Sequence, residues 1–271
     1  MTGAAGQLGR ALGPALRGHE TIALDRAALD IEDPVAVRAA VAAHRPEAVV
    51  NAAAYNFVDR AESEHEAAFR GNALGPRNLA EATAEAGASI VHVSTDYVFD
   101  GEAGRPYDER DTPNPLSVYG RSKLAGEEAV RAANPRHYVV RTAWVFAPRA
   151  RNFPSTMLRL AEAGPVRVVY DQVGSPTYAP HLAEAIARLL EAGAFGIHHL
   201  AGAGAVSWHG FTVELFRCLG LATAVEPAST AEFPRPARRP RYAPLVTIRE
   251  PRIELPAWQE GVAAYAAALA A

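Results

Sequence analysis

The sequence predicts an α/β protein built on a doubly wound parallel sheet, with a smaller C-terminal domain. Three observations support this prediction: a glycine-rich turn at residues 3–9, short apolar runs that alternate with Ala- and Leu-rich helical segments, and polar residues at the ends of several of those runs. Strands that alternate with helical segments are typical of βαβ units, which form parallel sheets.

Composition bounds the classes of protein that this chain can belong to. It has 271 residues, 49% hydrophobic and 21% charged, enough for one large domain or two unequal ones. A net charge of -3 gives no basic surface for nucleic acid. Cys218 is the only cysteine, which excludes disulfides and thiolate metal sites. No run reaches the roughly 18 apolar residues of a membrane span, and no export signal is recognisable, so we expect a cytoplasmic protein.

The glycine-rich turn has the pattern G-x-x-G-x-x-G and precedes an Ala/Leu-rich segment that suits a helix. Glycines let the backbone approach a pyrophosphate, whose charge then lies at the helix N-terminus. The pattern therefore predicts a dinucleotide site in a Rossmann-type sheet. The residues expected to bind the cofactor in this turn are Gly3, Gly6, Gln7, Leu8 and Gly9.

A dinucleotide-binding turn requires a strand before its first glycine, and only Met1 and Thr2 precede Gly3. That first strand is central in the usual strand order. Without it, its two neighbours would lie about twice the normal spacing of about 4.8 Å apart, with costly unpaired backbone groups between them. We therefore expect a first strand that is truncated here and a native chain that begins several residues upstream.

Residues 20–25 form the next expected strand, which ends in Asp25 about 20 positions after the glycines. A carboxylate at this position binds the adenosine ribose of NADH. Arg26 follows directly and suits the 2′-phosphate of NADPH, so the pair leaves the choice between NADH and NADPH open. The alternative for Asp25 is a solvated loop carboxylate.

The apolar run at residues 89–93 predicts a strand with Thr95 at its C-terminal end, where ligands bind in open parallel sheets. Tyr119 and Lys123 lie four residues apart, so on a helix they share one face. A phenol with a pKa of roughly 10 is a poor acid at neutral pH, but a nearby ammonium stabilises the phenolate. Tyr119 could then donate a proton. The alternative is that this spacing arises by chance, with a half-buried tyrosine ring beside a solvated lysine.

Further elements follow from apolar periodicity and turn residues. Residues 233–240 read as a stiff basic loop, and guanidinium groups bind phosphate oxygens in bidentate fashion; a mobile surface segment is the alternative. We expect strands at residues 47–51, 136–143, 166–170 (returning to the central sheet) and 196–200, and helices at residues 64–86, 152–164, 178–191 and 207–219, the last capped by Ser207.

These features, in this order, resemble an extended short-chain dehydrogenase/reductase. Four stretches resemble the dTDP-4-dehydrorhamnose reductases in particular: STDYVFDG at 94–101, RTAWV at 141–145, NFPSTMLRL at 152–160 and DQVGSPT at 171–177. The resemblance covers nearly the whole chain. It implies NAD(P)H-dependent reduction of the C4 ketone of dTDP-4-dehydro-6-deoxy-L-mannose to dTDP-L-rhamnose, in cell-surface polysaccharide biosynthesis.

The resemblance also implies roles for individual residues. Tyr119 would protonate the developing alkoxide, Thr95 would hydrogen-bond the same oxygen, and Lys123 would hold the nicotinamide ribose and lower the pKa of the phenol. Asp96, Trp144 and Arg239 would contact the substrate, although Trp144 could instead be a core residue. Further cofactor contacts are implied for Asp30, Ile31, Ala53, Ala54, Tyr55 and Val93.

On this basis, residues 1–148 and 166–200 should form the NAD(P)-binding Rossmann domain. Residues 149–165 and 201–271 should form the dTDP-sugar domain. The resemblance further implies a homodimer through the helix at residues 64–86. Members of the family have been associated with Mg²⁺ at acidic surface positions, but the nine histidines form no metal pattern, and nothing in the sequence locates a metal site.

Two departures from the family pattern leave alternatives open. Asn56 and Phe57 replace a Thr and a small residue, and Ala243 stands where a serine is usual. A related nucleotide-sugar 4-ketoreductase of different stereochemistry is therefore one alternative. A non-catalytic regulatory subunit that retains the fold is the other, although the presence of Thr95, Tyr119 and Lys123 together argues against it.

Overall fold

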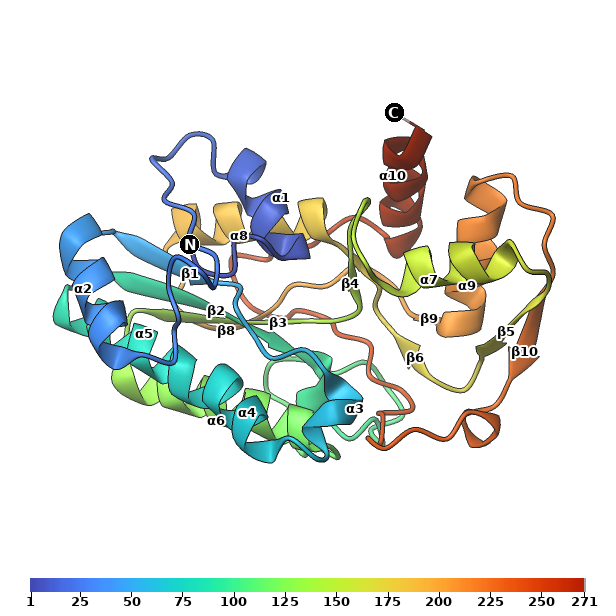
Figure 1. Cartoon of the computed structure of the whole chain (residues 1–271), viewed down its shortest axis with the longest axis horizontal. Coiled ribbons are helices and arrows are strands. Elements are labelled where there is room, and N and C mark those ends of the chain that lie inside the picture. Colours follow the sequence, from blue (N-terminus) through green and yellow to red (C-terminus); the bar gives the residue numbers. More distant parts are fainter. Residues whose placement is uncertain (271) are drawn as a thin grey trace.

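The structure, a computed structural model, describes residues 1–270. Its centre is a parallel sheet in the order β1-β2-β3-β8 (Figure 1). The four strands are β1 (Ala48–Asn51), β2 (Ser89–Thr95), β3 (His137–Thr142) and β8 (Gly196–His199). All three pairings between them are parallel, which confirms the predicted fold class.

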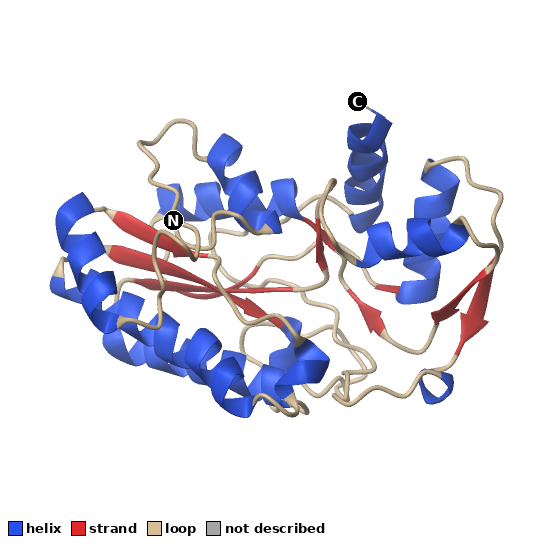
Figure 2. Ribbon diagram, in the orientation of Figure 1, coloured by secondary structure: helices blue, strands red, loops and turns tan. Residues whose placement is uncertain are grey.

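Helices cover both faces of this sheet (Figure 2). Successive side chains of a strand point to opposite faces, so Val50 packs with α1 and α8, whereas Val49 packs with α2 and α5. The helices on the first face are α1 (Gln7–Ala15) and α8 (Ala179–Ala192), and those on the second are α2 (Pro34–His44), α5 (Gly75–Glu85) and α6 (Val118–Ala133).

The start of the chain lies inside the sheet. Thr2 forms parallel bridges to Leu24 on one side and to Asn51 on the other, with its N–H donating to the Val50 carbonyl at 3.0 Å. The first strand was expected between these two neighbours, and this position is confirmed. The expected strand at residues 20–25 is not formed, because Leu24 has only this single bridge partner.

A cavity of about 740 Å³ lies beside Met1. Its walls come from residues 18–24 and 44–50 and from apolar side chains such as Tyr138 and Phe195.

The long helix expected at residues 64–86 is divided into three parts. These are α4 (His65–Phe69), a π-helical turn η1 (Arg70–Leu74) and α5. π-turns inside helices are frequent at functional sites. This one carries the buried side chain of Asn72, which hydrogen-bonds to the backbone of Tyr55.

A second group of elements, with its own apolar core, lies beside the sheet (Figure 1). Here β5 pairs in parallel with β10, so the expectation that residues 166–170 return to the central sheet is wrong. The elements are α7 (Phe153–Ala161), β5 (Val166–Val169), β6 (Val173–Gly174), β9 (Val206–Ser207), α9 (Trp208–Cys218), β10 (Val225–Ala228), η3 (Thr230–Glu232) and α10 (Trp258–Ala270).

The remaining short elements are α3 (Val58–Ala61), η2 (Asp96–Val98), β4 (Val145–Phe146) and β7 (Thr177–Tyr178). Within residues 1–270, no helix has both the length and the apolar character that a membrane crossing requires.

Candidate active site

The contact between α6 and the end of β2 brings the predicted catalytic residues together. Ser117 caps α6 by accepting the Gly120 N–H at 3.1 Å, which places Tyr119 in the first helical turn. A Cβ on Gly120 would lie 2.3 Å from the Tyr97 carbonyl oxygen. Glycine at this position therefore lets the helix approach the segment that follows Thr95.

Tyr119 lies near Thr95 and Asp96, and both side chains affect the pKa of its phenol. Burial and the nearby Asp96 carboxylate raise the pKa of Tyr119 above its ordinary value, and the Thr95 contact only partly offsets them. The Thr95 hydroxyl donates to Asp96 Oδ1 at 3.0 Å. Burial raises the pKa of Asp96 to about 7. Tyr119 therefore carries its proton at neutral pH.

Lys123 is one helical turn beyond Tyr119, and only 2% of it is exposed. Its ammonium donates to the Val93 carbonyl at 2.6 Å. Burial lowers the pKa of Lys123 to about 8, although Glu127 acts in the opposite direction. The expected lowering of the Tyr119 pKa by Lys123 is not what this structure shows, because burial and Asp96 dominate that pKa.

The glycine turn has the shape that a dinucleotide site needs. Gly3 has a φ of 70°, and a Cβ there would lie 2.5 Å from the Ala53 nitrogen. A Cβ on Gly9 would lie 2.3 Å from the Gly3 carbonyl oxygen. Gly6 is the N-cap of α1 and supplies no side chain to cap it. The first N–H groups of α1 are therefore suited to a pyrophosphate, which bears negative charge.

Gln7 and Leu8 anchor this turn in opposite directions. The side-chain oxygen of Gln7 accepts the Ala147 N–H at 3.1 Å and the Asn152 amide at 2.8 Å. Leu8 is buried against the sheet. The turn is thus fixed both to the sheet and to the segment that leads into α7.

The residues predicted to bind adenosine lie on the loop after Leu24. Asp25 is exposed and accepts the N–H groups of residues 27 and 28 at 3.0 Å. Arg26 is exposed, 3.7 Å from Glu32. Asp30 is also exposed, whereas the Ile31 side chain is buried in the core of the second face, where a Cβ on Gly75 would collide with it.

Residues 53–55 lie at the end of β1, beside the glycine turn. Ala53, Ala54 and Val93 are partly buried, and Tyr55 is held by Asn72, whose Oδ1 accepts the Tyr55 N–H at 2.8 Å. The Asn72 amide also donates to the Ser122 hydroxyl on α6 at 3.0 Å. Asn72 therefore links the proposed cofactor segment to the helix that carries Tyr119. A polar residue within an Ala-rich helix is the signal that could have identified it.

Trp144 lies two residues after the end of β3 and has a φ of 48°, a backbone conformation that L residues adopt rarely. Its ring stacks on Trp208 with centroids 3.4 Å apart and planes 4° apart. Both side chains are partly buried. The sequence pointed to Trp144 from its position after a strand, but Trp208 gave no such signal.

Arg239 lies in the predicted basic loop and reaches the other part of the molecule. Its Nη1 and Nη2 donate to the two oxygens of Asp59, at 3.0 Å and 2.9 Å. Asp59 belongs to α3, and its carboxylate also accepts the Ala237 N–H at 3.3 Å. The bidentate pair fixes the orientation of the Arg239 guanidinium beside the site.

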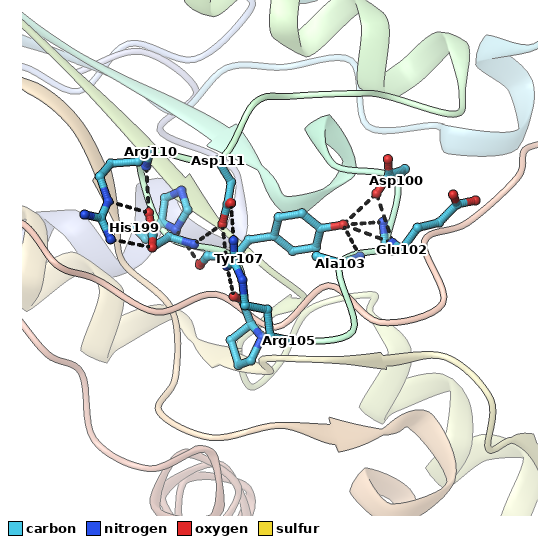
Figure 3. Close-up of polar contacts among 11 residues, drawn as sticks. Asp100, Glu102, Ala103, Arg105, Tyr107, Arg110, Asp111 and His199 are labelled. Carbon is cyan, nitrogen blue, oxygen red and sulfur yellow. Dashed lines mark hydrogen bonds and ion pairs between the residues drawn. The ribbon is translucent and has the colours of Figure 1, made fainter.

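The loop at residues 100–115, which follows η2, is fixed mainly by Tyr107 (Figure 3). The phenol oxygen accepts backbone N–H groups of residues 101–103 at 3.0 to 3.2 Å and donates to Asp100 at 2.6 Å. Gly101 has a φ of 79°, and a Cβ there would lie 2.6 Å from the Arg241 nitrogen. The loop therefore packs directly on the basic loop.

No group of three or more His, Cys, Asp or Glu side chains in residues 1–270 is arranged to hold a metal ion.

The chain is similar to known proteins along its whole length. A family model described as the RmlD substrate binding domain matches residues 1–271. A dTDP-4-dehydrorhamnose reductase of Streptomyces griseus is 46% identical over 255 residues, which cover 90% of this chain and 84% of that protein. A protein of Streptomyces antibioticus named as a probable dTDP-4,6-dihydroxy-2-methyloxan-3-one 4-ketoreductase is 45% identical over 251 residues, covering 90% and 85%.

The chain is also similar to a solved structure of a dTDP-4-dehydrorhamnose reductase. The dTDP-4-dehydrorhamnose reductase of Bacillus anthracis, in complex with NADP, superposes with a TM-score of 0.94 at 37% identity and covers 97% of this chain and 96% of that one. The chain belongs to the RmlD substrate-binding-domain family, whose relatives include dTDP-4-dehydrorhamnose reductases.

Proposed function

We propose that this protein reduces the C4 ketone of dTDP-4-dehydro-6-deoxy-L-mannose with NAD(P)H, giving dTDP-L-rhamnose for cell-surface polysaccharide biosynthesis. The observation that carries the proposal is the placement of Tyr119. It is a buried phenol beside the Thr95 hydroxyl, with Lys123 one helical turn away. Relatives named for this reaction share the family.

The cofactor fits the glycine turn. NADPH or NADH supplies the hydride when bound. The backbone of residues 3–9 would hold its pyrophosphate at the N-terminus of α1. Asp25 or Arg26 would bind the adenosine ribose or its phosphate, and Lys123 the nicotinamide ribose. The further contacts that we propose are those of Asp30, Ile31, Ala53, Ala54, Tyr55 and Val93.

Tyr119 would give its proton to the ketone oxygen as that oxygen becomes an alkoxide. An alkoxide is far more basic than a phenolate, so the raised pKa of Tyr119 still allows this transfer and keeps the phenol protonated beforehand. The Thr95 hydroxyl would donate a hydrogen bond to the same oxygen. Asp96 and Trp144 would contact the sugar, and Arg239 the diphosphate.

A related nucleotide-sugar 4-ketoreductase of different stereochemistry is the second candidate. Phe57 leaves it open, because this large side chain stands where the family usually has a small one. The similarity to the 4-ketoreductase of Streptomyces antibioticus also favours it.

The test is a turnover assay with NADPH and dTDP-4-dehydro-6-deoxy-L-mannose generated in situ, with the product identified by NMR. We expect nicotinamide absorbance to fall as dTDP-L-rhamnose forms. A product with the other configuration at C4 would support the second candidate, and no cofactor oxidation would contradict both.

We also propose a cytoplasmic homodimer. Nicotinamide nucleotides and nucleotide-sugars are held inside cells, which supports the location. Phe69 and Leu74, on the segment expected to form the dimer face, are exposed apolar side chains, which supports the assembly. A monomer mass in light scattering would contradict the dimer.

A further inference from the structure

A buried ion pair continues the Tyr119–Lys123 face of α6 by one further helical turn. Glu127 is one helical turn beyond Lys123 and is 1% exposed. Its carboxylate accepts hydrogen bonds from Arg141 Nη2 at 2.7 Å and Nε at 3.0 Å, and from the Ser94 hydroxyl at 2.5 Å. The proposed reaction gives none of these three side chains a role.

This cluster completes the attachment of α6 to the sheet. Tyr119 meets Thr95, Lys123 binds the Val93 carbonyl, and Glu127 binds Ser94. Three successive turns of the helix therefore contact the last three residues of β2. Ser94 is paired in register with Arg141 of β3, so Glu127 ties the helix to two strands at once.

The charges around Lys123 give Glu127 a second effect. The other ionisable groups of this region are Tyr119 on α6, His92 on β2, Asp96 on η2 and Arg141 on β3. Burial and Lys123 itself keep the pKa of His92 well below its ordinary value, so this ring is neutral. Glu127 is the carboxylate that favours the charged form of Lys123 against burial.

We propose that Glu127 is a positioning residue, which keeps Lys123 in its charged form and fixes α6 on the ends of β2 and β3. The inference rests on the proposed function, in which the Lys123 ammonium holds the cofactor ribose.

The test uses a property of the sequence: Lys123 is the only lysine in the chain. Protein grown with ¹³C-labelled lysine therefore gives a single lysine side-chain signal, whose NMR titration reports Lys123 alone in the cofactor-free protein. In Glu127→Gln we expect the midpoint to fall by roughly one pH unit, the scale of losing a nearby opposite charge. The matched control is Glu128→Gln on the exposed side of α6, which should leave the midpoint unchanged.

A second variant separates charge from structure. Arg141→Gln breaks the same ion pair but keeps the Glu127 carboxylate, so the Lys123 midpoint should not fall. If Glu127 had a purely structural role, the Lys123 midpoint would shift in the same direction in both variants. Because Glu127→Gln leaves a buried arginine unpaired and could fail to fold, the double variant Glu127→Gln/Arg141→Met provides a neutral pair in which the midpoint should still fall.

An unchanged midpoint in both the single and the double variant would overturn the proposal, as would an equal fall in Arg141→Gln. In turnover assays at increasing pH, the activity of Glu127→Gln should be lost at a lower pH than the activity of the wild type. Wild-type protein without any turnover would remove the proposed function, while the NMR midpoints would still decide the role of Glu127.

Discussion

Burial controls the acid–base behaviour of the side chains nearest the proposed reacting oxygen. It raises the pKa of Tyr119 and brings that of Asp96 to about 7. The sequence could indicate Tyr119, Lys123 and Thr95 because their pattern is local: two residues on one helix and one at a strand end. It could not indicate Glu127 with Arg141, which lie on different elements, because no local pattern encodes their contact.

The raised pKa of Asp96 makes a prediction about stability. The native state binds this proton more tightly than the unfolded chain, where the pKa is near 3.8. Stability from this group is therefore complete below about pH 4 and is lost as pH rises through about 7. Asp96→Asn stays neutral, so its thermal midpoint should exceed that of the wild type by an amount that grows over this range, reaching several degrees.

Asp100→Asn is the control for that series. Hydrogen bonds, chiefly from Tyr107, lower the pKa of Asp100, so this carboxylate contributes stability at neutral pH that is lost as pH falls. The Asp100 variant should therefore be less stable than the wild type at pH 7, with the difference shrinking in acid. Parallel pH trends for the two variants would contradict both assignments.

At the level of elements, local periodicity correctly predicted the helices and strands that do not depend on a distant partner. The helix that carries Tyr119, the strand that ends at Thr95 and the Ser207 cap of α9 formed as expected. Residues 166–170 did not join the central sheet, because their partner β10 lies about 60 residues along the chain and no local pattern encodes that pairing. The π-turn at residues 70–74 was equally invisible, since it depends on the burial of Asn72.

The glycine turn gives a prediction at this scale with its own control. Gly9→Ala places a Cβ 2.3 Å from the Gly3 carbonyl oxygen, which should distort the turn and weaken NADPH binding at least tenfold. Gly13 belongs to the same helix and has open space around it. Gly13→Ala should therefore bind NADPH as the wild type does and gain about 0.5–1 kcal/mol in stability. Fluorescence titration with NADPH measures both, and equal affinities would refute the assigned role of Gly9.

Across the whole molecule, the two groups of elements meet where Arg239 binds Asp59, a pair separated by 180 residues in the chain. The family resemblance placed a phosphate-binding arginine on the basic loop, but its partner on α3 depends on the assembled fold. The cavity beside Met1 is likewise a property of the assembled sheet. The expected position of the first strand in the sheet was nevertheless correct.

Asp59→Asn tests this contact. Without the carboxylate, the Arg239 guanidinium loses its fixed orientation, and we expect dTDP to bind about tenfold more weakly, roughly 1.4 kcal/mol, with NADPH affinity unchanged. Calorimetry measures both ligands. Glu66→Gln, in the exposed first turn of α4, is the control. Wild-type or tighter dTDP binding by Asp59→Asn would show that Asp59 does not position Arg239.

The most direct test of the central claim compares Tyr119→Phe with the wild type. NADPH affinity is measured first, and then the fall in nicotinamide absorbance with dTDP-4-dehydro-6-deoxy-L-mannose generated in situ. Because the phenol is the proposed proton donor and does not build the glycine turn, we predict that the variant binds NADPH with wild-type affinity and shows no turnover. Turnover by Tyr119→Phe at the wild-type rate would contradict the assignment of Tyr119 as the acid.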